Sequence, residues 1–317
     1  MSATPSLPLD LVCLGEAMVE FNQTPDDPTR YTAGFGGDTS NCAIAAARIG
    51  ARSGYITQVG DDVFGAQLLA LWRDEGVDTA GVRVLAAGET GVYFVTHGAQ
   101  GHAFTYRRAG SAASRMAPDD AAFAPCIQQA GRARTLHVSG ISQAISASAR
   151  AVVAVAIERA RAQHARVAYD LNFRPRLWSA EAARPVVEGT AGVADIFLPS
   201  LDEVALLAGT RTPEEALQWA HGLGAPIVVL KLGAQGCWVS QRSGVTRLPP
   251  YSVSAVDATG AGDCFAGTLL ARLAAGDDIV AAARAANVAA ALSTLGPGAV
   301  APLPQWPQVR AVLASLA

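Results

Sequence analysis

The sequence lacks the features that mark several classes of protein. None of its apolar runs approaches the length of a membrane-spanning helix. Residues 1–8 have neither a basic start nor an apolar core, so we predict no secretory signal peptide. The net charge of −3 provides no basic surface for a nucleic acid. We therefore expect a protein that binds neither membranes nor nucleic acids.

Charged residues and cysteines are also few. Only 16% of the residues are charged, below the typical share of roughly a quarter, whereas 50% are hydrophobic. A large buried core is therefore expected. The five cysteines are widely spaced and include no CxxC pair: Cys13, Cys42, Cys126, Cys237 and Cys264. Buried free thiols in a reducing cytoplasm are the simplest interpretation.

Strand-like and helix-like segments alternate along most of the 317 residues. Short apolar runs predict strands at 9–14, 53–59, 135–138, 167–170, 195–198, 227–230, 237–240 and 245–248. Longer periodic runs predict helices at 43–49, 63–75, 146–164, 201–208, 263–275, 278–295 and 305–317. This alternation favours an α/β fold with a doubly wound, mainly parallel sheet flanked by helices. Without internal repeats or a linker, we expect a single domain over residues 1–317.

Two segments break this alternation. Residues 90–96 and 103–108 alternate as strands do and are joined by 97–102, which predicts a β-hairpin rather than a βαβ unit. Residues 16–33 are mixed and rich in turn formers. A hairpin inserted in an α/β chain can be a flap over a site or a decoration of the sheet edge, and the residues alone leave both open.

A glycine-rich stretch near the C-terminus, Val256–Asp263, predicts a loop that feeds a helix. Gly260, Ala261 and Gly262 would let an anion approach the free backbone N–H groups at the positive end of that helix. Asp263 would stand beside the anion and could take a proton from an attacking hydroxyl. The alternative is a simple capped helix. The spacing matches neither a Walker A loop nor a dinucleotide fingerprint.

A second glycine-rich stretch follows residue 35. Gly36 and Gly37 would let the backbone approach a ligand, and Asp38 and Asn41 offer polar groups for the hydroxyls of a ligand. An ordinary turn that caps a helix is the alternative. Both stretches are expected at the carboxyl ends of strands, where open α/β sheets bind ligands.

Together the two stretches resemble the signatures of the PfkB/ribokinase-like carbohydrate kinases. The C-terminal signature reads Asp-Thr-x-Gly-Ala-Gly-Asp, and here Ala258 stands where threonine is common. The N-terminal signature begins Gly-Gly and continues through Asn-x-Ala, as at Gly36, Gly37 and Asn41. The resemblance covers nearly the whole chain. It implies a ribokinase-like fold with a small β lid, formed by segments of about 16–37 and 90–110, and a kinase that uses ATP and Mg²⁺.

Two further segments resemble the 2-keto-3-deoxygluconate kinases within this family. The loop Asp170–Trp178 matches their Asp-x-Asn-x-Arg-x-x-Leu-Trp pattern, and residues 106–114 are similar to their hairpin. The resemblance implies that Tyr93, Tyr106 and Asn172 contact the substrate, although either tyrosine is alternatively a packed hairpin aromatic.

An acidic substrate needs a cation, and the planar fork of arginine suits a carboxylate in a closed site. Arg107 and Arg174 are the candidates for that role. Arg108 is an alternative to Arg107, displaced by one residue, and Arg176 is expected to face solvent.

The nucleotide side of the site is implied by the family patterns alone. Glu203 matches the glutamate of Asn-x-x-Glu, which lies near metal-bound water and phosphate, whereas Ser200 replaces the asparagine. A first-turn acidic residue is the alternative for Glu203. Lys231 would reach the ATP phosphates, beside the phosphate turn with Gly233 and Gly236.

Two residues remain from the family pattern. Asn287 falls where the family closes around adenine. Asp257 is placed for a monovalent cation such as K⁺.

The sequence therefore predicts ATP-dependent phosphorylation of 2-keto-3-deoxygluconate to its 6-phosphate. Asp263 would act as base, and the N–H groups of residues 260–263 would stabilise the transferring group. The alternatives are a kinase for a neutral sugar such as fructose or ribose, and a sugar-acid sensor without catalysis. The exposed edge of the flap favours a homo-oligomer.

Overall fold

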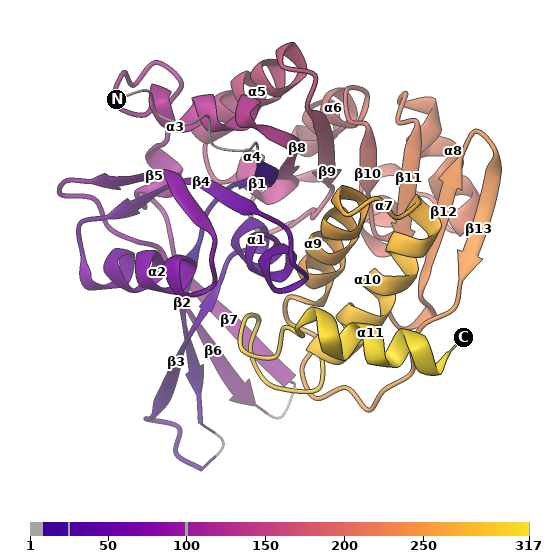
Figure 1. Ribbon diagram of the computed structural model, residues 1–317. Coiled ribbons are helices and arrows are strands. Elements are labelled where there is room, and N and C mark those ends of the chain that lie inside the picture. Colours follow the sequence, from indigo (N-terminus) through magenta and orange to yellow (C-terminus); the bar gives the residue numbers. More distant parts are fainter. Residues whose placement is uncertain (1–8, 25, 99–100, 317) are drawn as a thin grey trace, which may run out of the picture.

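The computed structural model describes residues 9–24, 26–98 and 101–316 (Figure 1). Our expectation for residues 1–8 and the centre of the predicted hairpin turn, Ala99 and Gln100, lie outside the described residues. The described chain forms a nine-stranded sheet with the order β13-β12-β11-β10-β9-β8-β1-β4-β5 and a four-stranded sheet with the order β3-β2-β6-β7.

The larger sheet is parallel except at one edge. Its parallel strands are β1 (Leu9–Leu14), β4 (Ser53–Gly60), β5 (Asp78–Leu85), β8 (Ala133–Ser139), β9 (Arg166–Asp170), β10 (Ile196–Leu198) and β11 (Ile227–Lys231). Strands β12 (Cys237–Gln241) and β13 (Gly244–Leu248) add an antiparallel edge. Parallel neighbours need long crossovers, and helices supply them.

Helices cover both faces of this sheet, and each face has its own hydrophobic core. On one face lie α1 (Asp38–Arg48), α2 (Val63–Asp74), α9 (Ala261–Ala274), α10 (Ile279–Ser293) and α11 (Trp306–Ser315). On the other lie α3 (Ala124–Gln128), α5 (Ala147–Ala162), α6 (Ala180–Ala191), α7 (Leu201–Ala208) and α8 (Pro213–Gly222). The short α4 (Gly140–Ala144) follows β8. Alternate residues of β1 enter opposite cores, because strand side chains have a period of two.

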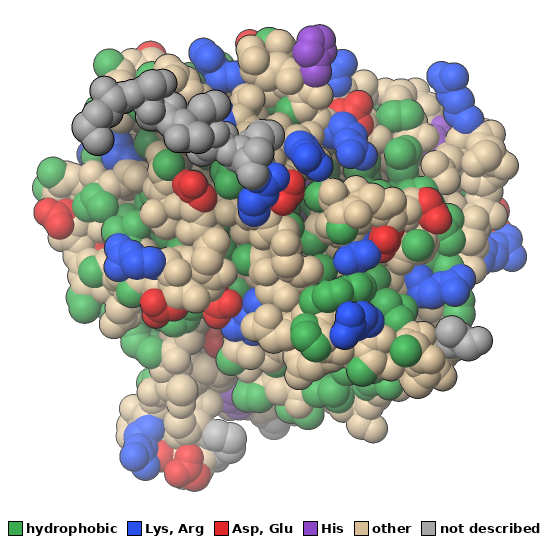
Figure 2. Space-filling model, in the orientation of Figure 1, with side chains coloured by type: hydrophobic (Ala, Val, Ile, Leu, Met, Phe, Trp, Pro, Cys, Tyr) green, Lys and Arg blue, Asp and Glu red, His purple; other side chains and the backbone are tan. Residues whose placement is uncertain are grey.

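The smaller sheet projects from the body (Figure 1). It contains β2 (Met18–Gln23), β3 (Tyr31–Gly36), β6 (Val92–Gly98) and β7 (Gly101–Arg107). The predicted hairpin is confirmed as the antiparallel pair β6–β7, which joins the β2–β3 pair through parallel pairing of β2 with β6. Figure 2 shows charged side chains at the far tip of this sheet. We call these four strands the lid sheet.

The predicted α/β class with a doubly wound, mainly parallel sheet is confirmed. The sequence did not reveal β2, β3, β5, α6 or α8. Helix α1 begins at Asp38 rather than at 43, because its polar first turn, residues 38–41, is buried and lacks an apolar signature. Across the described residues, no helix is both long and apolar enough to span a membrane. All five cysteines are free and buried.

Candidate active site

The N-terminus of α9 opens at the carboxyl end of the large sheet. Its N-cap is Gly260, with a left-handed φ of 76°, and a Cβ at this position would lie 3.0 Å from Cβ of Ala299. Within the described chain, no side chain caps this helix. The helix begins at Ala261, slightly earlier than predicted, so Gly262 and Asp263 lie in its first turn. The Ala261 N–H donates to the Ala258 carbonyl at 3.2 Å, and the N–H groups of Gly262 and Asp263 in the same turn are available to an anion.

Asp263 is held from α1. Asn41 Nδ2 donates a hydrogen bond of 2.8 Å to Asp263 Oδ2. The two helices approach closely, because a Cβ on Gly267 would lie only 2.3 Å from the carbonyl oxygen of Cys42. The two glycine-rich stretches that the sequence singled out thus meet at one carboxylate.

The environment of Asp263 raises its pKa to about 8. Burial contributes most, and the negative charge of Asp38 adds to it. The hydrogen bond from Asn41 and the charge of Arg174 act in the opposite direction. A carboxylate with a pKa near neutrality is suited to exchange a proton during a reaction.

Asp38 lies beside this pair at the start of α1. Its Oδ2 accepts hydrogen bonds from Ser139 Oγ and from Asn172 Nδ2, the latter at 3.1 Å. Asp38 Oδ1 and Asn41 Oδ1 are buried and have no hydrogen-bond partner in the described structure. Since buried polar atoms are normally paired, these two acceptors indicate a ligand with hydroxyl donors.

A charged cluster follows on the neighbouring strand ends. Lys231 Nζ, at the end of β11, lies 2.7 and 2.8 Å from the two carboxylate oxygens of Asp170, at the end of β9. A Cβ on Gly262 would lie 3.8 Å from Lys231 Nζ, so the ammonium group is close to the start of α9. Arg174 Nη1 donates to Glu203 Oε1 at 3.2 Å.

Glu203 and Ser200 form a capping box at the start of α7. Glu203 Oε2 accepts from the Ser200 backbone N–H at 3.0 Å, and Ser200 Oγ accepts from the Glu203 N–H at 3.3 Å. Burial raises the pKa of Glu203, while the charges of Lys231 and Arg174 lower it. Glu203 is therefore a first-turn acidic residue that caps its helix, as the alternative in the sequence analysis had it. Its Oε1 nevertheless faces the charged cluster.

Tyr93 and Tyr106 lie on one face of the lid sheet. They are cross-strand partners, and their rings stack with centroids 5.6 Å apart. The Tyr93 hydroxyl donates to Glu20, a buried residue of β2 that the sequence did not indicate. Gly36 passes under this ring, since a Cβ there would lie 2.3 Å from the Tyr93 hydroxyl oxygen. This packing explains why residue 36 is a glycine.

Arg107 lies on the opposite face of β7 from the two tyrosines. It pairs with Val92, its side chain is exposed, and its Nη1 donates to the carbonyl of Tyr106. Arg108 lies with its guanidinium 5.9 Å from the ring centroid of Tyr106, and its side chain is 12% exposed. The alternative arginine of the sequence analysis therefore accompanies the tyrosines, because consecutive residues of a strand face opposite sides.

Arg108 forms an ion pair with the buried Glu16. Its Nη2 makes this contact with Glu16 Oε2, whereas its Nε is buried and makes no hydrogen bond in the described structure. Arg176, which the sequence placed in solvent, is exposed but also donates to the carbonyl of Phe104 in β7 at 3.1 Å. The loop after β9 thus contacts the lid sheet.

The remaining candidates shape loops around the start of α9. Gly233 and Gly236 adopt positive φ angles of 56° and 87°. Asn287 Nδ2 donates to the carbonyl of Pro249 at 3.2 Å. Asp257 Oδ1 accepts from Thr259, and Asp257 Oδ2 accepts from the Gly298 N–H at 2.8 Å. Asp257 therefore ties its own loop to the turn at residue 298.

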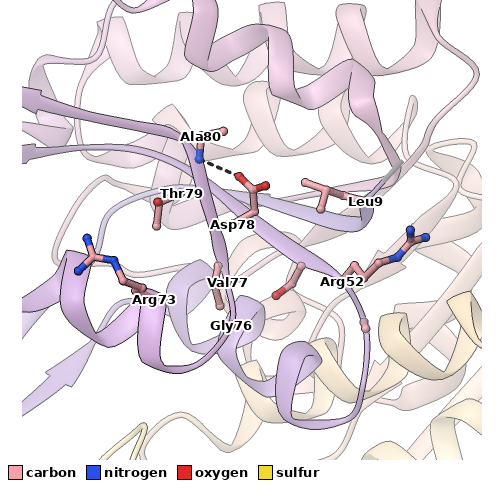
Figure 3. Close-up of a pocket in the computed structure, with 10 residues that line it drawn as sticks. Leu9, Arg52, Arg73, Gly76, Val77, Asp78, Thr79 and Ala80 are labelled. Carbon is pink, nitrogen blue, oxygen red and sulfur yellow. Dashed lines mark hydrogen bonds between the residues drawn. The ribbon is translucent and has the colours of Figure 1, made fainter. Parts of the chain in front are cut away.

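A separate hollow of about 580 Å³ lies at the opposite ends of the strands, away from their carboxyl ends (Figure 3). It is lined at the amino ends of β1, β4 and β5, among others by Leu9, Arg52 and Asp78. Arg52 is already paired with Asp10 at 2.9 Å. This hollow is remote from the strand ends that carry Asp170 and Lys231, so it is not part of the candidate site.

Comparison with known proteins decides the family. The model of the pfkB family carbohydrate kinases matches residues 9–306. This chain belongs to the pfkB family of carbohydrate kinases. It is therefore a phosphotransferase that acts on a sugar hydroxyl.

Relatives of this pfkB kinase carry two kinds of name. It is 36% identical to the 2-dehydro-3-deoxygluconokinase of Thermoproteus tenax, over 90% of this chain and 88% of that protein. The enzyme of the same name from Dickeya dadantii is 33% identical over 94% and 98% of the two chains. Fructokinase-1 of Zea mays is 31% identical over 94% and 96%.

Solved structures agree with this fold. The PfkB protein from Polaromonas sp. JS666 aligns with a TM-score of 0.84 and 30% identity, covering 96% of this chain and 99% of that one. A ribokinase-type protein from Escherichia coli, solved with ATP and Mg²⁺, aligns with a TM-score of 0.86 and 26% identity over 97% and 99%. The ribokinase-like fold predicted from the sequence is thus confirmed.

Proposed function

We propose that this pfkB kinase transfers the γ-phosphoryl group of ATP to the 6-hydroxyl of 2-keto-3-deoxygluconate. The observation that carries the proposal is the buried guanidinium of Arg108 on the face of Tyr93 and Tyr106: its Nη2 is ion-paired with Glu16, but its buried Nε has no hydrogen-bond partner in the described structure. Such a donor matches the carboxylate of a sugar acid, which a neutral hexose does not carry. We therefore assign the carboxylate role to Arg108 in place of Arg107, with Arg174 as the second arginine.

The other end of the sugar would lie between α1 and α9. The unpaired oxygens of Asp38 and Asn41 are acceptors for sugar hydroxyls, and Asn172 is held against Asp38. The terminal hydroxyl would approach Asp263. The names of the relatives from Thermoproteus tenax and Dickeya dadantii support a sugar acid as substrate.

In the proposed reaction, Asp263 takes the proton of the sugar hydroxyl as its oxygen attacks the γ-phosphorus. The P–O bond to the leaving ADP breaks as the new P–O bond forms. The N–H groups of Gly260, Gly262 and Asp263 would face the transferring phosphoryl group at the positive end of α9, and that of Ala261 would have to share its hydrogen bond to the Ala258 carbonyl. Lys231 would donate to the phosphates from its place beside Gly262.

Mg²⁺ fits the donor set of this site as a cofactor carried largely by the nucleotide. Among the described residues there is no cluster of three or more His, Cys, Asp or Glu that could hold a metal. Mg²⁺ commonly keeps several waters and binds one or two carboxylates plus phosphates, and Glu203 would contact it through water. When bound, it neutralises charge on the phosphates.

A monovalent cation such as K⁺ at Asp257 remains a proposal. Both oxygens of this carboxylate already accept hydrogen bonds, so a cation would share them. Asn287 and the phosphate turn with Gly233 and Gly236 would complete the ATP site.

The lid sheet would close over the sugar and exclude water as a competing acceptor. We propose one kinase domain over residues 1–317, with this sheet as its lid. The five free buried cysteines support a cytoplasmic enzyme. The edge strands β3 and β7 offer a surface for a homo-oligomer.

A panel of sugars tests the function. ADP release would be measured with 2-keto-3-deoxygluconate, fructose and ribose as acceptors, and we expect the highest kcat/KM with the sugar acid. The fructokinase relative from Zea mays makes fructose the second candidate. A preference for fructose or ribose would refute the carboxylate role of Arg108. Binding of sugar and ATP without ADP release would indicate a sensor.

A further inference from the structure

Two excursions of the chain build the lid sheet, so the chain crosses four times between body and lid. The first excursion leaves after β1 and returns before α1, and the second leaves after β5 and returns after β7. The crossings lie near Ala17, Gly37, Gly91 and Arg108. They are distant in sequence, so contacts between the crossings are needed to fix the position of the lid relative to the body.

Glu16 lies at the meeting point of all four crossings. It precedes β2 on the first crossing and is 1% exposed. Its carboxylate forms an ion pair with Arg108 and accepts a hydrogen bond from Ser111 Oγ, both on the return from β7. A Cβ on Gly91 would lie 3.0 Å from Glu16 Oε1, and one on Gly37 would lie 2.4 Å from the Glu16 carbonyl oxygen.

We propose that Glu16 is the positioning residue that fixes the lid sheet on the body of the kinase. Glu16 itself lies on the crossing near Ala17, and its carboxylate is bonded to the crossing near Arg108. The other two crossings contain Gly37 and Gly91, which pack directly against Glu16. A side chain at Gly37, whose φ is 120°, would collide with the backbone of Glu16, and one at Gly91 would crowd the Glu16 carboxylate. The carboxylate thereby sets where Tyr93, Tyr106 and Arg108 stand relative to Asp263. The inference rests on the proposed function only in taking these lid residues as sugar contacts.

Glu16 is also the ion-pair partner of Arg108. Its role as counter-ion and its role in positioning the lid predict opposite effects of Glu16→Gln on the KM for the sugar. If Glu16 served only as counter-ion, Glu16→Gln would free the guanidinium for an anionic sugar and lower the KM for that sugar. If Glu16 positions the lid, the loosened lid must be ordered on binding, and the KM for the sugar rises. The KM for ATP, whose proposed site lies on the body, stays unchanged.

The experiment compares Glu16→Gln with Glu75→Gln by hydrogen–deuterium exchange without ligand. Glu75 is a matched control, because it forms a similarly shielded ion pair with Arg48 at 2.6 Å, away from the crossings. We expect at least tenfold faster exchange in residues 18–36 and 92–107 of Glu16→Gln, with the nine-stranded sheet unchanged. Glu75→Gln should leave exchange in the lid unchanged. Equal exchange in the lid of Glu16→Gln and wild type, or equal acceleration in both variants, would overturn the proposal.

Kinetics supplies the second readout. With whichever acceptor the sugar panel identifies, Glu16→Gln should raise the sugar KM about tenfold and leave the ATP KM within about twofold. A lowered sugar KM would overturn the positioning role. Ser111→Ala removes one hydrogen bond and keeps the charge of Glu16, so it should change exchange in the lid in the same direction by less, and it serves if Glu16→Gln does not fold. The exchange measurement needs no sugar, so its failure is distinguishable from failure of the proposed substrate.

Discussion

Asn41 and Asp263 are 222 residues apart in the sequence, yet the Asn41 amide donates to the Asp263 carboxylate at 2.8 Å. The bond joins the first turns of α1 and α9, the two helices that follow the glycine-rich stretches. It leaves Asp263 Oδ1 for another partner and limits how far the carboxylate can rotate. Asp263 is therefore oriented before a substrate arrives, as a positioned base requires.

The first prediction concerns the base. Asp263→Asn keeps the shape of the side chain and removes its ability to accept a proton, so kcat should fall by roughly 10²–10⁴-fold. In the wild type, kcat/KM should rise with pH up to about 8, because the carboxyl group must lose its proton before it acts. Steady-state rates between pH 6 and 9 measure both effects. A variant with near-normal kcat would contradict the role of Asp263.

The same residue makes a prediction about stability. Its pKa in the folded protein is about 8, raised from 3.8, so its contribution to stability is complete below about pH 4 and is lost as the pH rises through 8. At pH 8 the free energy of unfolding of Asp263→Asn should therefore exceed that of the wild type by on the order of 2 kcal/mol, so the variant should unfold at a higher temperature. Thermal unfolding at pH 4.5 and 8 measures the difference. Asp202→Asn, an exposed first-turn residue of α7, is the control.

Arginine geometry gives the third prediction. Arg108→Lys keeps the charge beside Glu16 but loses the planar fork, so the KM for 2-keto-3-deoxygluconate should rise about tenfold. Arg107→Lys, on the opposite face of the same strand, should change it less than about twofold. The two KM values are measured at saturating ATP. The reverse order of effects would return the carboxylate role to Arg107.

Lys231 gives the fourth prediction. Lys231→Met should raise the KM for ATP about tenfold, since an ammonium group beside the α9 N-terminus is lost. It also leaves Asp170, which is 2% exposed, without its cation, at a cost of about 3–5 kcal/mol. Adding Asp170→Asn should recover stability without recovering the ATP KM. Chemical denaturation and ATP titrations separate the two effects.

The fifth prediction tests the contact between α1 and α9. A Cβ on Gly267 would lie 2.3 Å from the Cys42 carbonyl oxygen and 2.8 Å from Cβ of Ala45. Gly267→Ala should therefore force the helices apart and destabilise the protein by about 1–3 kcal/mol. It should also lower kcat, because the Asn41 contact to Asp263 lengthens. Gly222→Ala, where a Cβ meets nothing within 4 Å, is the matched control for both measurements.

Much of the body could be read from the sequence, because strands buried on both faces are continuous apolar runs. The hairpin strands β6 and β7 of the lid were also predicted, but β2 and β3 were not, since residues 18–23 and 31–36 become progressively exposed toward the lid tip and alternate weakly. Strand β5 is an edge with mixed burial and gave a similarly weak signal. Apolar periodicity reports burial, so it misses elements that remain partly exposed to solvent.

The candidate site shows the same division. Motifs indicated Asp263 and Asn41 because glycine spacing next to a helix is visible in the chain. The choice between Arg107, the last residue of β7, and Arg108, which directly follows it, depends on which face of the lid sheet each side chain takes, and a shift of one residue reverses it. Glu16 and Glu20 were overlooked, although Glu16 directly follows a buried strand, where polar residues of α/β proteins often gather.

The lid sheet is encoded wholly within residues 18–107, whereas Asp170, Lys231 and Asp263 follow it. The lid's share of the proposed sugar contacts is therefore encoded apart from the residues proposed for the transfer chemistry. Recombination within this family could exchange the lid segments and leave the rest of the chain unchanged. A chimaera in which the corresponding segments of a fructokinase replace residues 16–37 and 90–111 would reproduce such an exchange in the laboratory.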